Sequence, residues 1–212
     1  MLDRFRFMHQ NRLTKFFSHI PVIETERLLL RRMVQADFRD MYAYARLELV
    51  TRYLLWDPHP DEKYTYRYLG AVQRQYRAGE FYDWAITLKT SGRMIGTCGF
   101  TSFSLPDDRG EIGYVLNPEY WGHGIVPEAV MAVMEFGFSE LKLNRIEAKY
   151  VFGNDRSRRV MEKCGMRFEG VLRSYMKIRD RYCDIGFCSI LRNRFDEIAA
   201  YRHFGSWKRP LF

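Results

Sequence analysis

Residues 111–130 read EIGYVLNPEYWGHGIVPEAV, and this stretch decides how the chain is organised. Its first part predicts a strand, Gly122 and Gly124 form a short loop, and apolar residues recur at helical spacing from Val126 onward. The first N–H groups of a helix have no partner inside it and favour an anion, and glycines let a ligand come close. The order strand, glycine loop, helix therefore predicts a phosphate cradle. An ordinary loop with a helix cap is the alternative.

Two common phosphate-binding motifs do not occur in the sequence. It contains no GxxxxGK[ST] and no GxGxxG after an early strand. The glycine loop instead lies in the middle of the chain, after a half that reads as antiparallel hairpins. A Walker-type nucleotide site and a dinucleotide-binding fold are therefore both disfavoured.

The flanking sequence predicts a mixed sheet. Residues with strand patterns lie on both sides of the glycine loop, at 27–32, 82–88, 93–102, 111–116, 145–152, 167–178 and 182–191. Helices are expected at 37–46, at 61–77 with Gly79 at the end, after Gly124, and at 155–163. Hairpins come first and strand–helix–strand units follow, so the fold class is α/β (α+β), with helices on the faces of the sheet.

One domain, residues 21–193, is expected between two extensions. Residues 1–20 are basic and aromatic, and they read either as a segment packed on the domain or a partner subunit, or as an amphipathic anchor for membrane or RNA. Residues 194–212 form a tail that reads as partly helical. A homodimer stays open.

Composition narrows the class of protein. Hydrophobic residues make up 47% of the 212, enough for a core, and the formal charge of +8 attracts polyanions such as RNA or a phosphate-rich ligand. The four cysteines form no CxxC pair and no zinc-ligand spacing, so we expect no metal. No run approaches the length of a membrane span and no secretory signal is visible, so we expect a cytoplasmic protein.

The sequence resembles the GNAT superfamily of acetyltransferases, and within it the ribosomal-protein N-acetyltransferase (RimJ/RimL-like) branch. Three segments carry the resemblance. They are Thr25–Arg31 (TERLLLR), Tyr120–Ala129 (YWGHGIVPEA), and Asn154–Ser157 (NDRS) followed by Glu162–Met166 (EKCGM). Their order and spacing hold from about residue 23 to residue 193. The fold implied is a splayed, mostly antiparallel sheet flanked by helices.

The resemblance also implies a cofactor, acetyl-coenzyme A, and the residues that bind it. The backbone N–H groups of Gly122, His123, Gly124, Ile125 and Val126 would hold the pyrophosphate, and Trp121 just before them is also expected to bind the cofactor. Pantetheine would lie along the edge of the strand at Tyr114, Val115 and Leu116, as an added strand does. Asn154 would bind the pantetheine arm, and Arg156 and Arg159 the 3′-phosphate. For Asn154 a plain helix cap, for the arginines a solvated helix face, and for His123 a solvent-facing side chain are the alternatives.

Two residues are candidates for proton transfer. An alkylammonium must lose a proton before its nitrogen can attack, and Glu111 is expected to be the base, directly or through water. A solvated carboxylate at the strand end is its alternative. Ser157 resembles the serine proposed as proton donor in this branch, and a serine bonded to backbone in the first helical turn is its alternative.

Four positions depart from the family pattern. Trp121 stands where many members have Gln or Arg, and Val126 replaces Gly or Ala and would crowd the loop. Pro127 lacks an N–H, so one phosphate contact is lost. Met161 occupies the position of a tyrosine acid in many relatives, which leaves Ser157 or water to donate the proton.

The acceptor is the open question. Trp56 and Asp57 precede the second long helix, where relatives bind the acceptor, so they are expected to shape an amine pocket; a turn with a buried Trp is the alternative. The resemblance favours the α-amine of a protein N-terminus, such as that of a ribosomal protein. A small amine (antibiotic, polyamine or amino acid) and a non-catalytic RNA- or ribosome-binding module are the rival interpretations. No DNA partner is expected.

Overall fold

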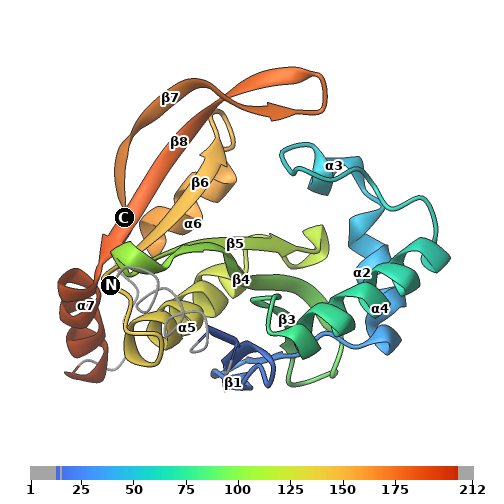
Figure 1. Ribbon diagram of the computed structural model, residues 1–212, viewed down its shortest axis with the longest axis horizontal. Coiled ribbons are helices and arrows are strands. Elements are labelled where there is room, and N and C mark those ends of the chain that lie inside the picture. Colours follow the sequence, from blue (N-terminus) through green and yellow to red (C-terminus); the bar gives the residue numbers. More distant parts are fainter. Residues whose placement is uncertain (1–12, 15, 205–212) are drawn as a thin grey trace.

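The computed structural model describes residues 13–14 and 16–204, and the described chain forms one eight-stranded sheet with helices on both faces (Figure 1). The strands lie in the order β1-β2-β3-β4-β5-β6-β8-β7. Their bounds are β1 Ile23–Glu24, β2 Leu28–Arg31, β3 Asp83–Leu88, β4 Met94–Ser104, β5 Arg109–Leu116, β6 Arg145–Val151, β7 Arg167–Ile178 and β8 Arg181–Leu191. The expected mixed, mostly antiparallel α/β fold is confirmed.

The centre of the sheet is split. β5 and β6 form the single parallel pair among the described strands, and they pair only from Arg109↔Arg145 to Glu111↔Glu147. After Glu111, β5 runs on to Leu116 along β4, while β6 runs on to Val151 along β8. The sheet is therefore continuous up to Glu111 and divides beyond it into two parts that diverge, as Figure 1 shows. The first part contains β1 to β5, and the second contains β6, β8 and β7.

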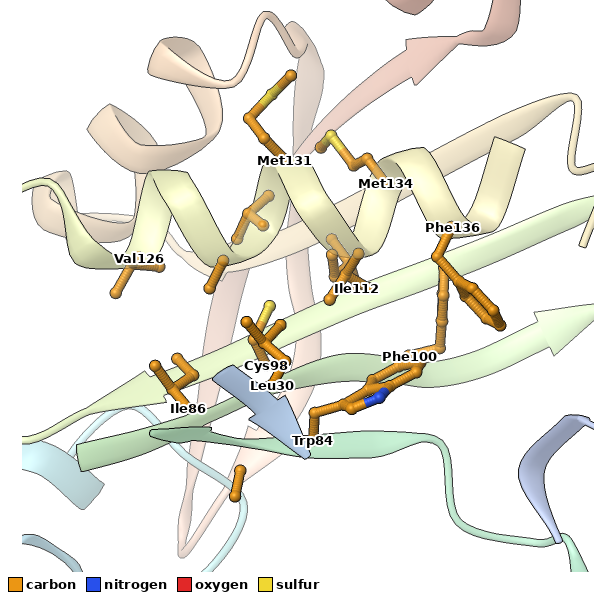
Figure 2. Close-up of a cluster of buried hydrophobic side chains, with 14 of the residues drawn as sticks. Leu30, Trp84, Ile86, Cys98, Phe100, Ile112, Val126, Met131, Met134 and Phe136 are labelled. Atoms are coloured by element: carbon orange, nitrogen blue, oxygen red, sulfur yellow. The ribbon is translucent and has the colours of Figure 1, made fainter. Parts of the chain in front are cut away.

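Helix α5 (Ile125–Ser139) covers one face of the first part of the sheet, which contains β3, β4 and β5, and forms the centre of the core (Figure 2). Trp84 and Ile86 of β3 and Ile112 of β5 point toward it, and each is at most 3% exposed. Because side chains alternate along a strand, Asp83 and Ala85 face the opposite side. That side is covered by α2 (Phe38–Ala45) and α4 (Glu62–Ala78), which contact each other.

The remaining helices are short or peripheral. α3 (Glu48–Thr51) follows α2, α6 (Asp155–Lys163) follows β6, and α7 (Arg192–Phe204) follows β8. The described residues also form three 3₁₀ turns: η1 Gln35–Asp37, η2 Leu105–Asp107 and η3 Pro118–Tyr120. No helix in the described ranges is long and apolar enough to cross a bilayer.

The described part of the N-terminal extension is built into the core. Phe17 is fully buried, and its ring lies 4.7 Å from Tyr82 and 5.7 Å from Trp84 between centroids. Leu13 and Ile20 are also buried. The segment from 13 to 20, where it is described, therefore packs on the domain. The rest of the extension, residues 1–12 and 15, and the end of the tail, residues 205–212, lie outside the described residues.

Candidate active site

A cleft of about 1420 Å³ opens where β5 and β6 diverge. It has two ends. The loop arm is lined by Trp121–Val126 (apart from His123) and by the residues around Asn154–Arg159. The aromatic arm lies toward α2, α3 and α4, and its aromatic lining is Tyr44, Tyr53, Trp56, His59, Tyr64, Tyr68, Phe81 and Tyr82. Residues from six strands, five helices and the loops between them thus face one space.

The two glycines of the loop arm leave it open. Gly122 and Gly124 have φ angles of 84° and 73°, a left-handed conformation that suits glycine. A Cβ at Gly122 would meet no described atom within 4 Å, and one at Gly124 would meet only Arg27, at 3.7 Å. Gly124 is the N-cap of α5, and no described side chain caps the helix there. The first amides of α5 are therefore free to bind an anion, except at Pro127.

An ion pair fixes the loop to the edge of the sheet. Glu128, in the first turn of α5, accepts from Thr25 Oγ1 at 2.6 Å and lies 2.6 Å from the Arg27 guanidinium. Arg27 also donates to the carbonyl oxygen of His123 at 2.9 Å. Burial raises the pKa of Glu128, but these hydrogen bonds outweigh burial and leave the pKa below its usual value. The sequence Thr25–Arg31 thus positions the glycine loop.

The predicted residues of the loop do not all face the cleft. Trp121 does, and its indole Nε1 donates to the Leu116 carbonyl at 2.9 Å while Arg156 lies over its ring at 4.4 Å. His123 is exposed and does not line the cleft. Val126 lines it but is only 8% exposed and points into the core (Figure 2).

Two of three neighbouring arginines point toward the loop arm. Arg156 and Arg159 line the cleft, whereas Arg158 pairs with Glu162 on its own helix at 2.8 Å. The two lining guanidiniums give this end of the cleft a positive wall, which suits phosphate groups.

The free edge of β5 presents backbone groups to the cleft. Asn117 N–H donates to the Ile95 carbonyl of β4 at 2.8 Å, so residue 117 faces β4. Backbone groups alternate along a strand, so those of Leu116 and Tyr114 face the gap left by β6. The Leu116 carbonyl is covered by Trp121, while the N–H of Leu116 faces the same gap. This edge can pair with an extended ligand.

A pair of hydroxyl groups crosses from β5 to α6. Tyr114 Oη lies 2.9 Å from Ser157 Oγ and donates to the Ser157 carbonyl at 3.0 Å. Asn154 Oδ1 accepts from the Ser157 N–H at 3.3 Å, so Asn154 caps α6 and lines the cleft as well. Burial raises the pKa of Tyr114, which keeps its hydroxyl protonated. A phenol therefore reaches the cleft from β5, although Met161 on α6 is buried and apolar.

Glu111 lies at the point of divergence and is already paired. Its Oε2 lies 2.6 Å from Lys149 Nζ, and both side chains are about one-fifth exposed. Lys149 also lies 5.4 Å and 5.7 Å from the ring centroids of Phe187 and Tyr175. The carboxylate thus borders the cleft with its charge balanced by a neighbouring strand.

The aromatic arm holds Trp56 but not Asp57. Trp56 lies against His59, which is buried and shares a 2.9 Å hydrogen bond between Nδ1 and Thr65 Oγ1. Burial lowers the pKa of His59. The Asp57 side chain is 80% exposed, does not line the cleft, and pairs with Arg179 from the β7–β8 hairpin at 3.1 Å.

Three features of the site were not predicted from the sequence. They are the Tyr114 hydroxyl, the Lys149 partner of Glu111, and Asp83 at the aromatic arm. Strand alternation carried a signal for Asp83, because its neighbour Trp84 reads as a core residue and a core strand turns the next side chain the other way. Among the described residues no group of His, Cys, Asp and Glu could hold a metal ion.

A comparison of the sequence with known protein families agrees with the geometry of the cleft. The sequence profile of the acetyltransferase (GNAT) domain matches residues 27–167, about two thirds of the chain. The chain belongs to the GNAT family of acetyltransferases. GNAT enzymes use acetyl-coenzyme A, and the open glycine loop, the free edge of β5 and the two arginines fit the pyrophosphate, pantetheine and phosphate parts of that molecule. The resemblance found in the sequence, and the expectation of an acetyl-transferring enzyme, are confirmed.

The GNAT relatives include named acetyltransferases. The chain is 33% identical over 176 residues to the uncharacterized N-acetyltransferase p20 of Bacillus licheniformis, which covers 83% of this chain and 99% of that protein. It is 24% identical to the [ribosomal protein uS5]-alanine N-acetyltransferase of Escherichia coli, over 79% of this chain and 90% of that protein. A solved GNAT acetyltransferase from Bacillus anthracis superposes with a TM-score of 0.73 at 29% identity, covering 82% of this chain and 99% of the other.

Proposed function

We propose that this GNAT enzyme transfers the acetyl group of acetyl-coenzyme A to a primary amine by direct attack in a ternary complex, and that its preferred acceptor is the α-amine of a protein N-terminus. The observation that carries the proposal is the single cleft that joins the open glycine loop to the aromatic arm across the free edge of β5. Both reactants can therefore bind at once, and the amine can reach the thioester without a covalent enzyme intermediate.

The loop arm binds the nucleotide end of acetyl-coenzyme A in this proposal. The amides of Gly122, Gly124 and the first turn of α5 hold the pyrophosphate, and Arg156 and Arg159 attract the 3′-phosphate. Pantetheine pairs with the backbone of β5 at Tyr114 and Leu116. The N–H of Leu116 is placed to donate to the thioester carbonyl oxygen and stabilise the negative charge that develops there.

Two groups move protons. Glu111, through water, accepts a proton from the acceptor ammonium, and Lys149 beside it stabilises the charge before that transfer. The amine nitrogen then forms a bond to the acetyl carbon, the carbon–sulfur bond breaks, and the nitrogen loses its second proton to water. The Tyr114–Ser157 pair gives a proton to the leaving thiolate. Ser157 is thus proposed as the proton donor together with Tyr114, and the phenol compensates for the methionine at position 161.

The preference for a protein N-terminus is supported by the E. coli relative, which is named for an alanine of ribosomal protein uS5. Trp56 and the other rings of the aromatic arm offer a broad wall for the first residues of a peptide. Asp57 is proposed to act at the rim, where its pairing with Arg179 joins the β7–β8 hairpin to the loop after α3. The four cysteines of the sequence form no CxxC pair, which supports the proposal that the enzyme works in the reducing cytoplasm.

A direct test measures thiol release from acetyl-coenzyme A with a panel of N-terminal peptides, polyamines, amino acids and aminoglycosides, and identifies products by mass spectrometry. The proposal predicts acetylation at the peptide α-amine, with the highest kcat/KM in the panel. Acetylation confined to a small amine would replace the preferred acceptor. Steeply salt-dependent RNA binding together with no thiol release from any amine would favour the non-catalytic module.

A further inference from the structure

Asp83 is a carboxyl group without a cation at the far end of the cleft from the glycine loop. It is the first residue of β3 and lines the aromatic arm, but its Oδ1 is closed off from solvent and accepts no hydrogen bond. In the described chain no Lys or Arg pairs with it. Burying an unpaired carboxylate is costly, so this group needs either a proton or a positive ligand.

A second orphaned group lies in the same corner. Tyr44 of α2 is fully buried, lines the same arm, and its hydroxyl has no hydrogen-bond partner in the described structure. Burial and, to a lesser extent, the charge of Asp83 raise the pKa values of Tyr44 and of Tyr68 on α4, so the carboxyl lies near both helices. A carboxylate oxygen and a phenol hydroxyl that line the same arm are therefore both without a hydrogen-bond partner, and an ammonium group can also rest on the faces of the aromatic rings there.

Two glycines lie on the sheet between Asp83 and the part of β5 where the acetyl transfer is proposed to occur. Asp83 pairs with Gly99 of β4, and Gly99 pairs with Gly113 of β5, so the three lie in one row across the sheet. Glu111 stands two residues from Gly113 and therefore on the same face of β5. All four line the cleft. A Cβ at Gly99 would come within 2.3 Å of the Asp83 Cα and within 2.8 Å of its Oδ1, so glycine is required beside this carboxyl.

The distance across the row from Asp83 to Gly113 determines which nitrogen of the acceptor Asp83 can bind. Two strand spacings separate Asp83 from Gly113 by roughly 10 Å between Cα atoms. An aspartate side chain is too short to span that, so a nitrogen held by Asp83 is not the one that attacks a thioester at the edge of β5. Glu111, balanced by Lys149, serves the reacting amine, and Asp83 is left for another positive group.

We propose that Asp83 binds a second cationic nitrogen of the acceptor, roughly 10 Å from the nitrogen that is acetylated, and so selects dicationic acceptors. The inference rests on the proposed acetyl transfer and names the acceptor class of that same cleft. A peptide N-terminus followed by a lysine and an aliphatic diamine both present this chemistry. Asp83 acts here in recognition and touches the acceptor away from the reacting atoms.

Matched acceptors test the proposal. The kcat/KM for octylamine is compared with that for its terminal diamine, corrected for its two equivalent amines, and a peptide with lysine at its second position is compared with the norleucine peptide. The wild-type enzyme should prefer the dication in at least one pair by roughly tenfold or more, the worth of one charge-assisted hydrogen bond. A preference in the peptide pair alone identifies a protein acceptor, and one in the diamine pair alone a small amine.

The Asp83→Asn variant should bring both ratios close to one and leave acetyl-coenzyme A affinity unchanged. Asp196→Asn, which removes the same charge from an exposed position on α7, should keep the wild-type ratios. An Asp83→Asn enzyme that still prefers the dication would overturn the inference. Equal rates for both members of each pair in an active wild-type enzyme would overturn it too and leave acetyl transfer standing. A wild type inactive with every amine would remove both proposals.

A pH series on the wild-type enzyme tests the same point without a variant. Burial raises the pKa of Asp83 to about 7, although the Thr97 side chain and the Trp84 N–H lower it in part. Its titratable neighbours Tyr44, Tyr68, Tyr76 and Cys98 have pKa values raised by burial and stay neutral around this pH. The preference for the dication should therefore grow as pH rises through about 7 and vanish below it. A ratio that does not change across this range contradicts the inference.

Discussion

The hydroxyl groups of Tyr114 and Ser157 lie 2.9 Å apart, one on β5 and one in the first turn of α6. These two elements border the cleft on either side of the path proposed for pantetheine. The contact joins a phenol that burial keeps protonated to a serine held by the Asn154 cap. In the proposed reaction this pair gives the leaving sulfur its proton, although position 161 carries methionine.

Replacing Tyr114 with Phe should lower kcat by about 10²-fold, the usual contribution of a positioned general acid, and change the KM for acetyl-coenzyme A little. Steady-state kinetics on Tyr114→Phe measures both values. Tyr182→Phe, at an exposed position on β8, is the control and should behave as wild type. Unchanged kcat in Tyr114→Phe would remove the phenol from the reaction.

Glu111→Gln should slow turnover by about 10²-fold and spare cofactor binding, because the amide cannot accept the proton while its shape is kept. Single-turnover rates and a titration with acetyl-coenzyme A separate the two effects. The matched variant Glu135→Gln lies at an exposed position on α5 and should retain full activity. If Glu111→Gln turns over at the wild-type rate, Glu111 is not the base.

The ion pair between Arg27 and Glu128 predicts that the stability of the folded protein depends on pH. The pKa of Glu128 is lowered from about 4.5 in the folded protein, so its stabilising effect is complete above that value and is lost as pH falls through the folded pKa. Glu128→Gln should therefore be less stable than wild type by roughly 1 kcal/mol at neutral pH, since Arg27 is partly exposed. Chemical unfolding should show the difference between the two proteins shrinking as pH falls below 4.5 and through the folded pKa of Glu128. A constant difference at every pH would contradict this account.

Phe17→Ala should destabilise the fold by about 3–5 kcal/mol, because a fully buried ring in contact with Tyr82 and Trp84 would leave a cavity. Calorimetry should show the melting temperature falling by roughly 10 °C. Phe152→Ala, at a site 58% exposed, should melt within about 2 °C of wild type. A small effect at Phe17 would mean that the extension contributes little to the core.

The sequence predicted the regular elements well where local signals were strong. Helix α6 occupies Asp155–Lys163 as expected, because Asn154 caps its start and a glycine follows its end. β1 and α3 were not predicted, since two and four residues carry no measurable period.

The site was predictable only in part, because some of its contacts depend on how distant strands meet. Glu111 and Lys149 are 38 residues apart and meet only because β5 and β6 pair in parallel up to Glu111. The glycine loop, in contrast, is one continuous segment whose chemistry can be read locally. Long-range pairings such as the anchor between Arg27 and Glu128 have no local signature.

The central claim is that the amides around Gly124 hold the pyrophosphate of acetyl-coenzyme A, and a calorimetric titration tests it most directly. Gly124→Glu places bulk and negative charge in the open loop, whereas Gly92→Glu makes the same change at a hairpin turn with a similar φ of 67° and open space around it. Wild type and Gly92→Glu should bind acetyl-coenzyme A saturably with equal affinity, and Gly124→Glu should not bind. Equal affinity in all three proteins, or no binding by folded wild type, would contradict the claim.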